Sequence, residues 1–174
     1  MNKELSVLTF GSPVGPITVI TDEISVCAVR FGIFEADVQS RRVPAPIAQE
    51  TVRQLQEYFE GIRHIFTVPV DPQGTDFQKK VWSALQTVPY GCTKTYKNIA
   101  EQINNPLASR AVGSANNKNP ISIIIPCHRI IGTSGKLVGY AAGLPVKQRL
   151  LALERRYVSS NALEMTCCRE PELF

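Results

Sequence analysis

The sequence lacks the features that would assign it to a membrane or secreted class of protein. Its longest apolar runs fall far short of the about 20 residues that a membrane-spanning helix needs. Residues 1–11 show no basic start followed by an apolar stretch, which a secretion signal would have. From these absences we expect a cytoplasmic protein with no membrane partner.

A metal site is also missing from the pattern. Cys27 has no Cys or His neighbour in sequence, and Cys167-Cys168 lacks the C-x-x-C spacing of a zinc site. The chain contains no internal repeats and no Gly-rich motif that could cradle a phosphate. We therefore predict that the protein binds no metal.

What the sequence does contain is an uneven distribution of charge. Residues 1–71 carry six Lys and Arg against nine Asp and Glu (−3), and residues 72–155 carry eleven against three (+8). Residues 156–174 carry two against three (−1), which completes the net charge of +4. A basic segment attracts a polyanion such as DNA, because phosphate neutralisation provides much of the binding free energy. A merely solvated basic surface is the alternative, and the scarcity of acidic residues disfavours it.

Hydrophobic periodicity and turn residues predict an α+β fold. The first domain is expected to be a small antiparallel-sheet α/β domain, in which a helix starting near Pro46 covers the sheet. The second is expected to be a mainly helical, winged-helix-like helix-turn-helix domain. The predicted strands span residues 4–10, 16–21 and 24–31. The predicted domains are residues 1–71 and 72–156, followed by a mobile tail at 157–174.

The second domain contains the clearest helix signals. Thr75 and Gln78 have the spacing of a capping box, which predicts a helix start. Two short helices are predicted next, one from Tyr96 and one with Pro106 at its first position. The second has one small apolar face and one polar face. The predicted inward face is Ala108, Ala111, Val112 and Ala115, and the outward face is Arg110, Ser114 and Asn117. Such a helix suits a DNA groove.

The candidate nucleophile follows a β-branched apolar run at residues 121–125. This run predicts a buried strand, which Pro126 ends because it has no backbone N–H to donate. Cys127 and His128 come next, and a nearby imidazole can activate a thiol as a nucleophile. A buried structural cysteine is the alternative for an arbitrary Cys-His pair.

Several motifs in order resemble the O6-alkylguanine-DNA alkyltransferases, which are methylated-DNA–protein-cysteine methyltransferases. Pro126-Cys127-His128-Arg129 is similar to the active-site signature of that family. Residues 109–113 and 119–120 stand where the family has its arginine-finger helix and its active-site asparagine. Gly139-Tyr140 and residues 150–154 resemble its tyrosine loop and its final helix. The resemblance is dense from about residue 75 to residue 154.

The resemblance implies irreversible, stoichiometric transfer of an alkyl group from O6-alkylguanine in double-stranded DNA to Cys127, after base flipping. O4-alkylthymine is a further candidate substrate. His128 would act as base through a water, Glu154 would orient His128, Asn119 would hold the turn, and Tyr96 would donate to the purine. Arg110 would fill the vacated stack. The remaining implied substrate- and DNA-binding residues are Ala108, Ser109, Ala111, Ser114, Arg129, Ile130, Val138, Tyr140, Ala141 and Lys147.

No cofactor is needed for such a transfer, and the resemblance implies minor-groove binding by a monomer, with cooperativity along DNA left open. Some members of the family hold zinc in the N-terminal domain, but this chain lacks the ligands. Two alternatives from other classes are a Cys-His acyl hydrolase and a DNA-binding module that senses lesions without chemistry. Relatives of the second kind replace the cysteine by tryptophan, whereas Cys127 is present here.

Overall fold

The computed structural model of the protein describes residues 4–34 and 43–160. The chain divides into two compact units, Met1–Gly74 with Asn119–Ile124, and Thr75–Lys118 with Ile125–Phe174. Residues 119–124, which the sequence placed in the helical domain, belong to the first unit. The reason is that the Val29 N–H donates to the Pro120 carbonyl, and the Ser122 N–H donates to the Val29 carbonyl. The domain boundary at residues 71 and 72 stays a prediction.

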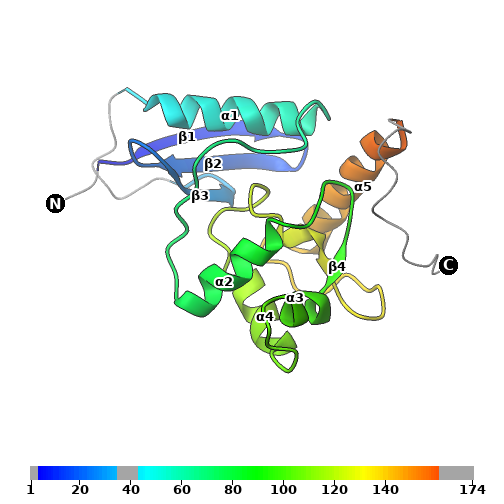
Figure 1. The fold of residues 1–174 in the computed structure, drawn as a ribbon. Helices are drawn as coiled ribbons and strands as arrows, with labels where there is room; N and C mark the ends of the chain where they lie inside the picture. The colour runs from blue at the N-terminus through cyan, green and yellow to red at the C-terminus, as the bar shows by residue number, and fades with distance from the viewer. Residues whose placement is uncertain (1–3, 35–42, 161–174) are drawn as a thin grey trace. The chain divides into compact units, whose positions relative to one another are not determined.

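The first unit is built on an antiparallel sheet of three strands in the order β1-β2-β3 (Figure 1). The strands are β1 (Ser6–Ser12), β2 (Gly15–Thr21) and β3 (Val26–Phe31). Thr9 pairs with Thr18 in the β1–β2 register, and their hydroxyl oxygens lie 2.8 Å apart. The predicted meander of three strands is confirmed.

Helix α1 (Pro46–Phe59) lies along this sheet, as Figure 1 shows. Proline is favoured at a helix start because its fixed φ suits the first turn and its missing N–H is not needed there. Leu55 and Tyr58 are fully buried, as their helical spacing predicted. Gly61 has a φ of 74° just beyond the helix, which is the left-handed conformation that glycine tolerates best.

The predicted strand at residues 121–125 is wrong, although its burial is right. Ile121 forms only a single bridge, with Val29 in the first unit, and Ile123 has a φ of 71°. A β-branched residue at positive φ cannot continue a strand, so the backbone turns instead. The apolar residues of the run are all buried, which explains why hydrophobicity alone resembled a strand.

The second unit is mainly helical. Its first helix begins with the predicted capping box, in which Thr75 accepts from the Gln78 N–H and the Gln78 side chain accepts from the Thr75 N–H. Trp82 is buried in this helix, and its indole N–H donates to the Ala115 carbonyl at 2.9 Å. The elements of the unit are α2 (Asp76–Leu85), β4 (Lys94–Thr95), α3 (Tyr96–Gln102), α4 (Ser109–Asn117), the 3₁₀ helix η1 (Cys127–Arg129), β5 (Ile130–Ile131) and α5 (Leu144–Ser160).

Helix α5 runs further than the sequence predicted. Residues 157–160, which were assigned to a mobile tail, continue the helix as its last turn. The rest of that tail, with Cys167-Cys168, lies outside the described residues. Across residues 4–34 and 43–160 no helix is long and apolar enough to cross a membrane. Within the same ranges no group of three or more His, Cys, Asp or Glu could hold a metal ion.

Candidate active site

The candidate nucleophile opens η1 in the second unit. Cys127 forms no disulfide, and only 3% of the residue is exposed. Its N–H donates to the Ile125 carbonyl at 2.8 Å, and its carbonyl accepts from the Asn116 amide at 3.3 Å. In a 3₁₀ helix, successive side chains diverge by about 120°. The side chains of Cys127 and His128 therefore do not face each other, although the segment is helical rather than extended as predicted.

His128 and Glu154 form a buried pair. The His128 Nε2 atom lies 2.7 Å from the Glu154 Oε1 atom, and both side chains are fully buried. Burial lowers the pKa of the His128 imidazole, and the neighbouring Glu154 carboxylate opposes that shift. Burial also tends to raise the pKa of Glu154, but His128 and Arg129 together hold it well below the usual range. The two shifts favour an ionised carboxylate, while burial disfavours the charged form of the imidazole.

Arg129 does not face outward as a DNA contact, and the structure corrects that expectation. The residue is 5% exposed, and its guanidinium donates to both oxygens of Glu154 at 3.0–3.2 Å. A further N–H donates to the Val88 carbonyl at 2.6 Å. A buried guanidinium needs an anionic partner, and Glu154 supplies one.

The Glu154 carboxylate accepts one more hydrogen bond from the loop before β4. The Gly91 N–H donates to Oε2 at 2.9 Å. Gly91 has a φ of 75°, and a Cβ atom there would lie 2.5 Å from a methyl group of Val158. This close approach of the loop to α5 therefore requires glycine.

Two further polar side chains surround the thiol. Burial and the neighbouring Cys127 raise the pKa of Tyr140 well above its usual value. Lys147 is fully buried, and its ammonium donates to the Ile130 carbonyl at 2.5 Å and to the Val138 carbonyl at 3.0 Å. Burial lowers the pKa of Lys147 to about 8, and Cys127 acts in the opposite direction. Cys127 thus lies among hydrogen-bond donors.

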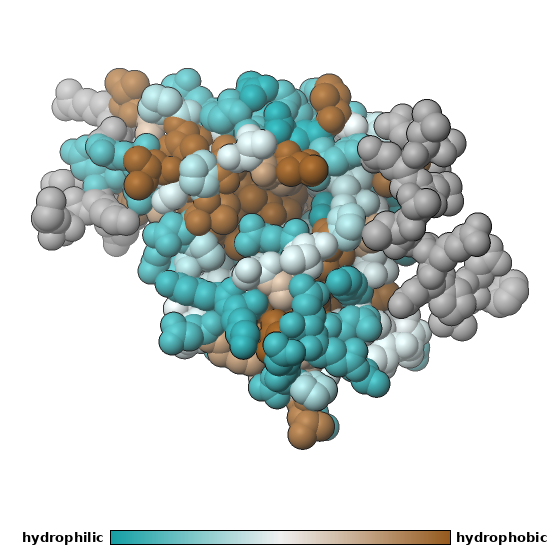
Figure 2. Space-filling model, viewed as in Figure 1, coloured by the Kyte–Doolittle hydropathy of each residue, from teal (hydrophilic) through white to brown (hydrophobic). Residues whose placement is uncertain are grey.

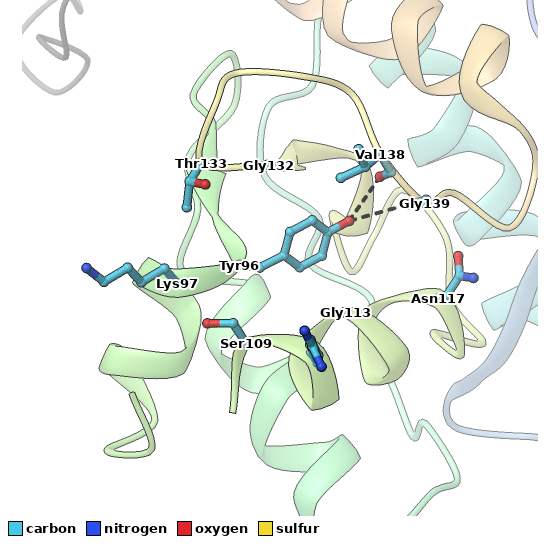
Figure 3. A pocket seen from close by; sticks show the side chains of 10 residues that line it. Tyr96, Lys97, Ser109, Gly113, Asn117, Gly132, Thr133, Val138 and Gly139 are labelled. Carbon is cyan, nitrogen blue, oxygen red and sulfur yellow. Dashed lines mark hydrogen bonds between the residues drawn. The ribbon is translucent and has the colours of Figure 1, made fainter. Parts of the chain in front are cut away.

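An open pocket of about 420 Å³ lies between α3, α4 and the loop that follows β5. Figure 3 shows the Tyr96 ring at its centre, with the hydroxyl directed at that loop. The hydroxyl donates to the Val138 carbonyl at 3.1 Å and to the Gly139 carbonyl at 3.4 Å. Burial and the nearby Cys127 raise the pKa of Tyr96, so the phenol remains a donor. The lining residues are Tyr96, Lys97, Ser109, Arg110, Gly113, Asn117, Gly132, Thr133, Val138 and Gly139.

Helix α4 presents a wider polar face than the sequence predicted. Ala111 is exposed together with Arg110, Ser114 and Asn117, and the buried residues are Val112, Ala115 and Asn116. Ala108 is the N-cap, so the helix starts later than Pro106 and its inward face is rotated toward Asn116. The surface over α2, α3 and α4 is mainly hydrophilic (Figure 2).

The other predicted site residues occupy varied places. Asn119 belongs to the first unit, where its side-chain oxygen accepts from the Ile121 N–H at 3.0 Å. Ile130 is fully buried, Tyr140 is half-buried, and Val138 and Ala141 are exposed. The second unit therefore brings together Cys127 and the predicted side chains on α3, α4, the loop and α5.

Two residues of this site escaped the sequence analysis. The Asn116 side-chain amide donates to the Cys127 carbonyl, and the Gly91 N–H donates to Glu154. A signal existed for Asn116, since it lies four residues after Val112 on the buried face. No local pattern connects Gly91 with a carboxylate 63 residues away.

Comparisons with known proteins converge on one family. Residues 76–156 match the model "6-O-methylguanine DNA methyltransferase, DNA binding domain", and residues 8–72 match the model of its "ribonuclease-like domain". The methylated-DNA–protein-cysteine methyltransferase of Methanosarcina acetivorans is 51% identical over 148 residues, which are 83% of this chain and 95% of that protein. The protein of the same name from Mycobacterium tuberculosis is 47% identical over 151 residues, 84% of this chain and 90% of that protein. The crystal structure of M. tuberculosis OGT in complex with DNA has a TM-score of 0.80 and 44% identity, covering 88% of this chain and 94% of that one.

Proposed function

The chain belongs to the 6-O-methylguanine DNA methyltransferase family, and from that premise we propose that Cys127 is the residue to which it transfers the alkyl group. The activity is direct repair of O6-alkylguanine in DNA by a single-turnover methylated-DNA–protein-cysteine methyltransferase. The observation that carries the assignment is the buried Cys127 thiol beside a His128–Glu154 pair joined at 2.7 Å. A thioether formed on Cys127 would not be hydrolysed, so one molecule would repair one lesion.

The transfer is a displacement at the alkyl carbon. The Cys127 sulfur forms the new bond to carbon while the bond from carbon to O6 breaks, and the electron pair passes to the guanine. The thiol proton goes to His128 through a water, because the two side chains diverge. Since Nε2 is bound to Glu154, Nδ1 is the ring nitrogen that receives it. The imidazolium then forms next to an ionised carboxylate, which stabilises it.

The leaving guanine needs a donor where its negative charge develops. Tyr96 reaches into the pocket from α3, and its hydroxyl now donates to the loop carbonyls of Val138 and Gly139. We assign this hydroxyl to donate to the purine N3, which would replace the two carbonyls as its acceptor when a base enters the pocket. Tyr140 and Lys147 stand close to the thiol and assist its ionisation through donation and positive charge. Residues 138–142 wall the base and offer backbone N–H groups to O6.

The DNA-binding element is assigned to α4, in the minor groove. Its exposed face carries Arg110, Ala111 and Ser114, and small side chains allow the backbone to come close to the DNA. Arg110 lines the pocket mouth and would fill the stack that the flipped base leaves. A monomer, a cytoplasmic location, activity on O4-alkylthymine, and the role of Asn119 in holding the turn stay predictions from the sequence.

Mass spectrometry of the intact protein tests the proposal. After incubation with an excess of O6-methylguanine duplex, we expect one added methyl mass per protein, located on the Cys127 peptide. Cys27 is an internal control, since it also forms no disulfide and is half-buried. Multiple turnovers without mass change, or a methyl group on Cys27, would overturn the assignment. Binding of the lesion without any transfer would indicate the sensing module instead.

A further inference from the structure

Arg129 is a cation of the basic segment that the fold turns inward. Its Nε atom lies 3.2 and 3.0 Å from the two oxygens of Glu154, and its Nη2 atom lies 3.0 Å from Oε1. Its Nη1 atom donates to the Val88 carbonyl, and the guanidinium stacks 5.6 Å from the centre of the Tyr90 ring. Each of the three guanidinium nitrogens therefore donates to a protein acceptor, and the residue is only 5% exposed, which keeps it from contacting a phosphate.

The same carboxylate also serves His128. Its Oε1 atom is shared between the His128 ring and Arg129, and its Oε2 atom is shared between Arg129 and the Gly91 N–H. A carboxylate whose charged partner is a histidine alone favours the protonated ring. Because Arg129 is a permanent cation bound to the same oxygens, the negative charge of Glu154 is shared between Arg129 and His128.

We propose that Arg129 is a positioning residue that fixes the Glu154 carboxylate and limits how strongly it stabilises the protonated form of His128. This inference rests on the proposed function, because it treats His128 as the acceptor of the thiol proton. A ring that is already protonated in the resting protein cannot accept that proton. Arg129 thus keeps the ring neutral, and Glu154 remains in place to stabilise the charge when it appears.

The charged and titratable groups around His128 act on its pKa in opposite directions. Glu154 and Lys147 approach from α5, Arg129 and Cys127 belong to η1, and Tyr90 stacks on the guanidinium. After burial, Glu154 has the largest effect on the pKa of His128 and raises it, whereas Arg129 and Lys147 lower it. Loss of Arg129 would leave only burial and Lys147 to oppose the effect of Glu154 on the pKa of His128.

The chain offers a direct measurement, because it contains only two histidines. We would label histidine in the full-length protein and follow both imidazoles by NMR across pH. In Arg129→Met, the titration midpoint of His128 should rise by about one pH unit or more, because a cation within contact distance is lost. His64 serves as the matched control and should not move, since it lies in the first unit.

The reaction with free O6-benzylguanine gives the functional readout and needs no DNA. In Arg129→Met, the acidic limb of the pH–rate profile should move to higher pH together with the titration midpoint of His128, because a protonated ring is inactive as a base. Arg129→Lys keeps the charge, so its midpoint should stay within a few tenths of a unit of the unmodified protein. Duplex affinity and its salt slope should be unchanged in Arg129→Met, whereas a lost phosphate contact would lower the slope by about one.

Removal of a buried cation can unfold a protein, so Arg129→Gln is the second neutral variant. It keeps an N–H donor for Glu154 without the charge, and it should show the same rise in midpoint. A folded neutral variant with unshifted His128 midpoint and unshifted acidic limb would overturn the inference. If both neutral variants fail to fold while Arg129→Lys folds normally, Arg129 serves the fold and the inference is also overturned. Failure of the proposed function would show separately, as a lack of alkylation in the unmodified protein.

Discussion

Two regions of the second unit hold their charged side chains in opposite ways. Around η1 and α5, the side chains of His128, Glu154 and Arg129 are at most 7% exposed and bind one another. Around α3 and α4, charged side chains such as Lys97 and Arg110 stand exposed beside the pocket. The first arrangement excludes water and fixes geometry, which proton transfer requires. The second leaves cations available for a polyanion, which recognition requires.

The difference between the two regions also predicts where mutations lower stability and activity most. Removing one partner from a buried ionic network leaves an uncompensated charge, whereas removing an exposed charge changes stability little. Substitutions in the buried region should therefore lower both stability and chemistry. Substitutions in the exposed region should affect only reactions that involve DNA.

The largest effect is expected for Glu154→Gln. The change should lower the rate of alkyl transfer about a hundredfold or more, because His128 loses the group that orients it and stabilises its charge. It should also lower the free energy of unfolding by about 3–5 kcal/mol, since Arg129 remains buried without its anion. Rapid-quench kinetics and urea unfolding measure the two effects. Glu101→Gln is the control, because Glu101 is an exposed carboxylate on α3. Comparable losses of rate and stability in that variant would contradict the predicted difference between the buried and the exposed region.

A smaller effect is expected from the reaction itself. An alkyl group on the buried Cys127 overpacks its surroundings, and such overpacking typically costs about 1–3 kcal/mol. The alkylated protein should therefore melt at a lower temperature than the unreacted one in a calorimetric scan. The control is protein incubated with the same duplex lacking the lesion. An equal or higher melting temperature would mean that the pocket around Cys127 is loosely packed.

The smallest effect should separate two helix caps. Thr75 and Thr95 cap α2 and α3 through similar capping boxes, so replacement of either by Ala should cost about 1 kcal/mol. Only α3 carries Tyr96, directly after its cap. Thr95→Ala should therefore also slow the reaction, while Thr75→Ala should leave it unchanged when both are assayed well below their melting temperatures. Equal rates in the two variants would show that the start of α3 does not position Tyr96.

The sequence predicted most of the fold because its signals are local. Three strands, the helix from Pro46 and the capping box at Thr75 follow from spacing within a few residues. Cys127, His128 and Glu154 could be named because their motifs resemble a known family. The adjacency of Glu154 to His128 in space has no local signal, and it came from the resemblance alone.

The errors come from interactions between distant residues. Hydrophobicity alone resembled a strand at residues 121–125, but the positive φ of Ile123 turns the backbone there. The resemblance implied that Arg129 binds substrate or DNA, but Glu154, 25 residues away, holds it in the interior. Neither burial of a charge nor a left-handed isoleucine can be derived from composition or periodicity.

The most direct test of the separation between chemistry and recognition is the ratio of two rates in Arg110→Ala. One rate is measured with an O6-alkylguanine duplex and the other with free O6-benzylguanine, which needs no base flipping. We predict that the duplex rate falls far more than duplex affinity does, while the free-base rate stays unchanged. A simple phosphate contact would instead weaken binding and lower the salt slope by about one. If the free-base rate falls as much as the duplex rate, Arg110 serves the pocket or the fold, and the two regions are not separate.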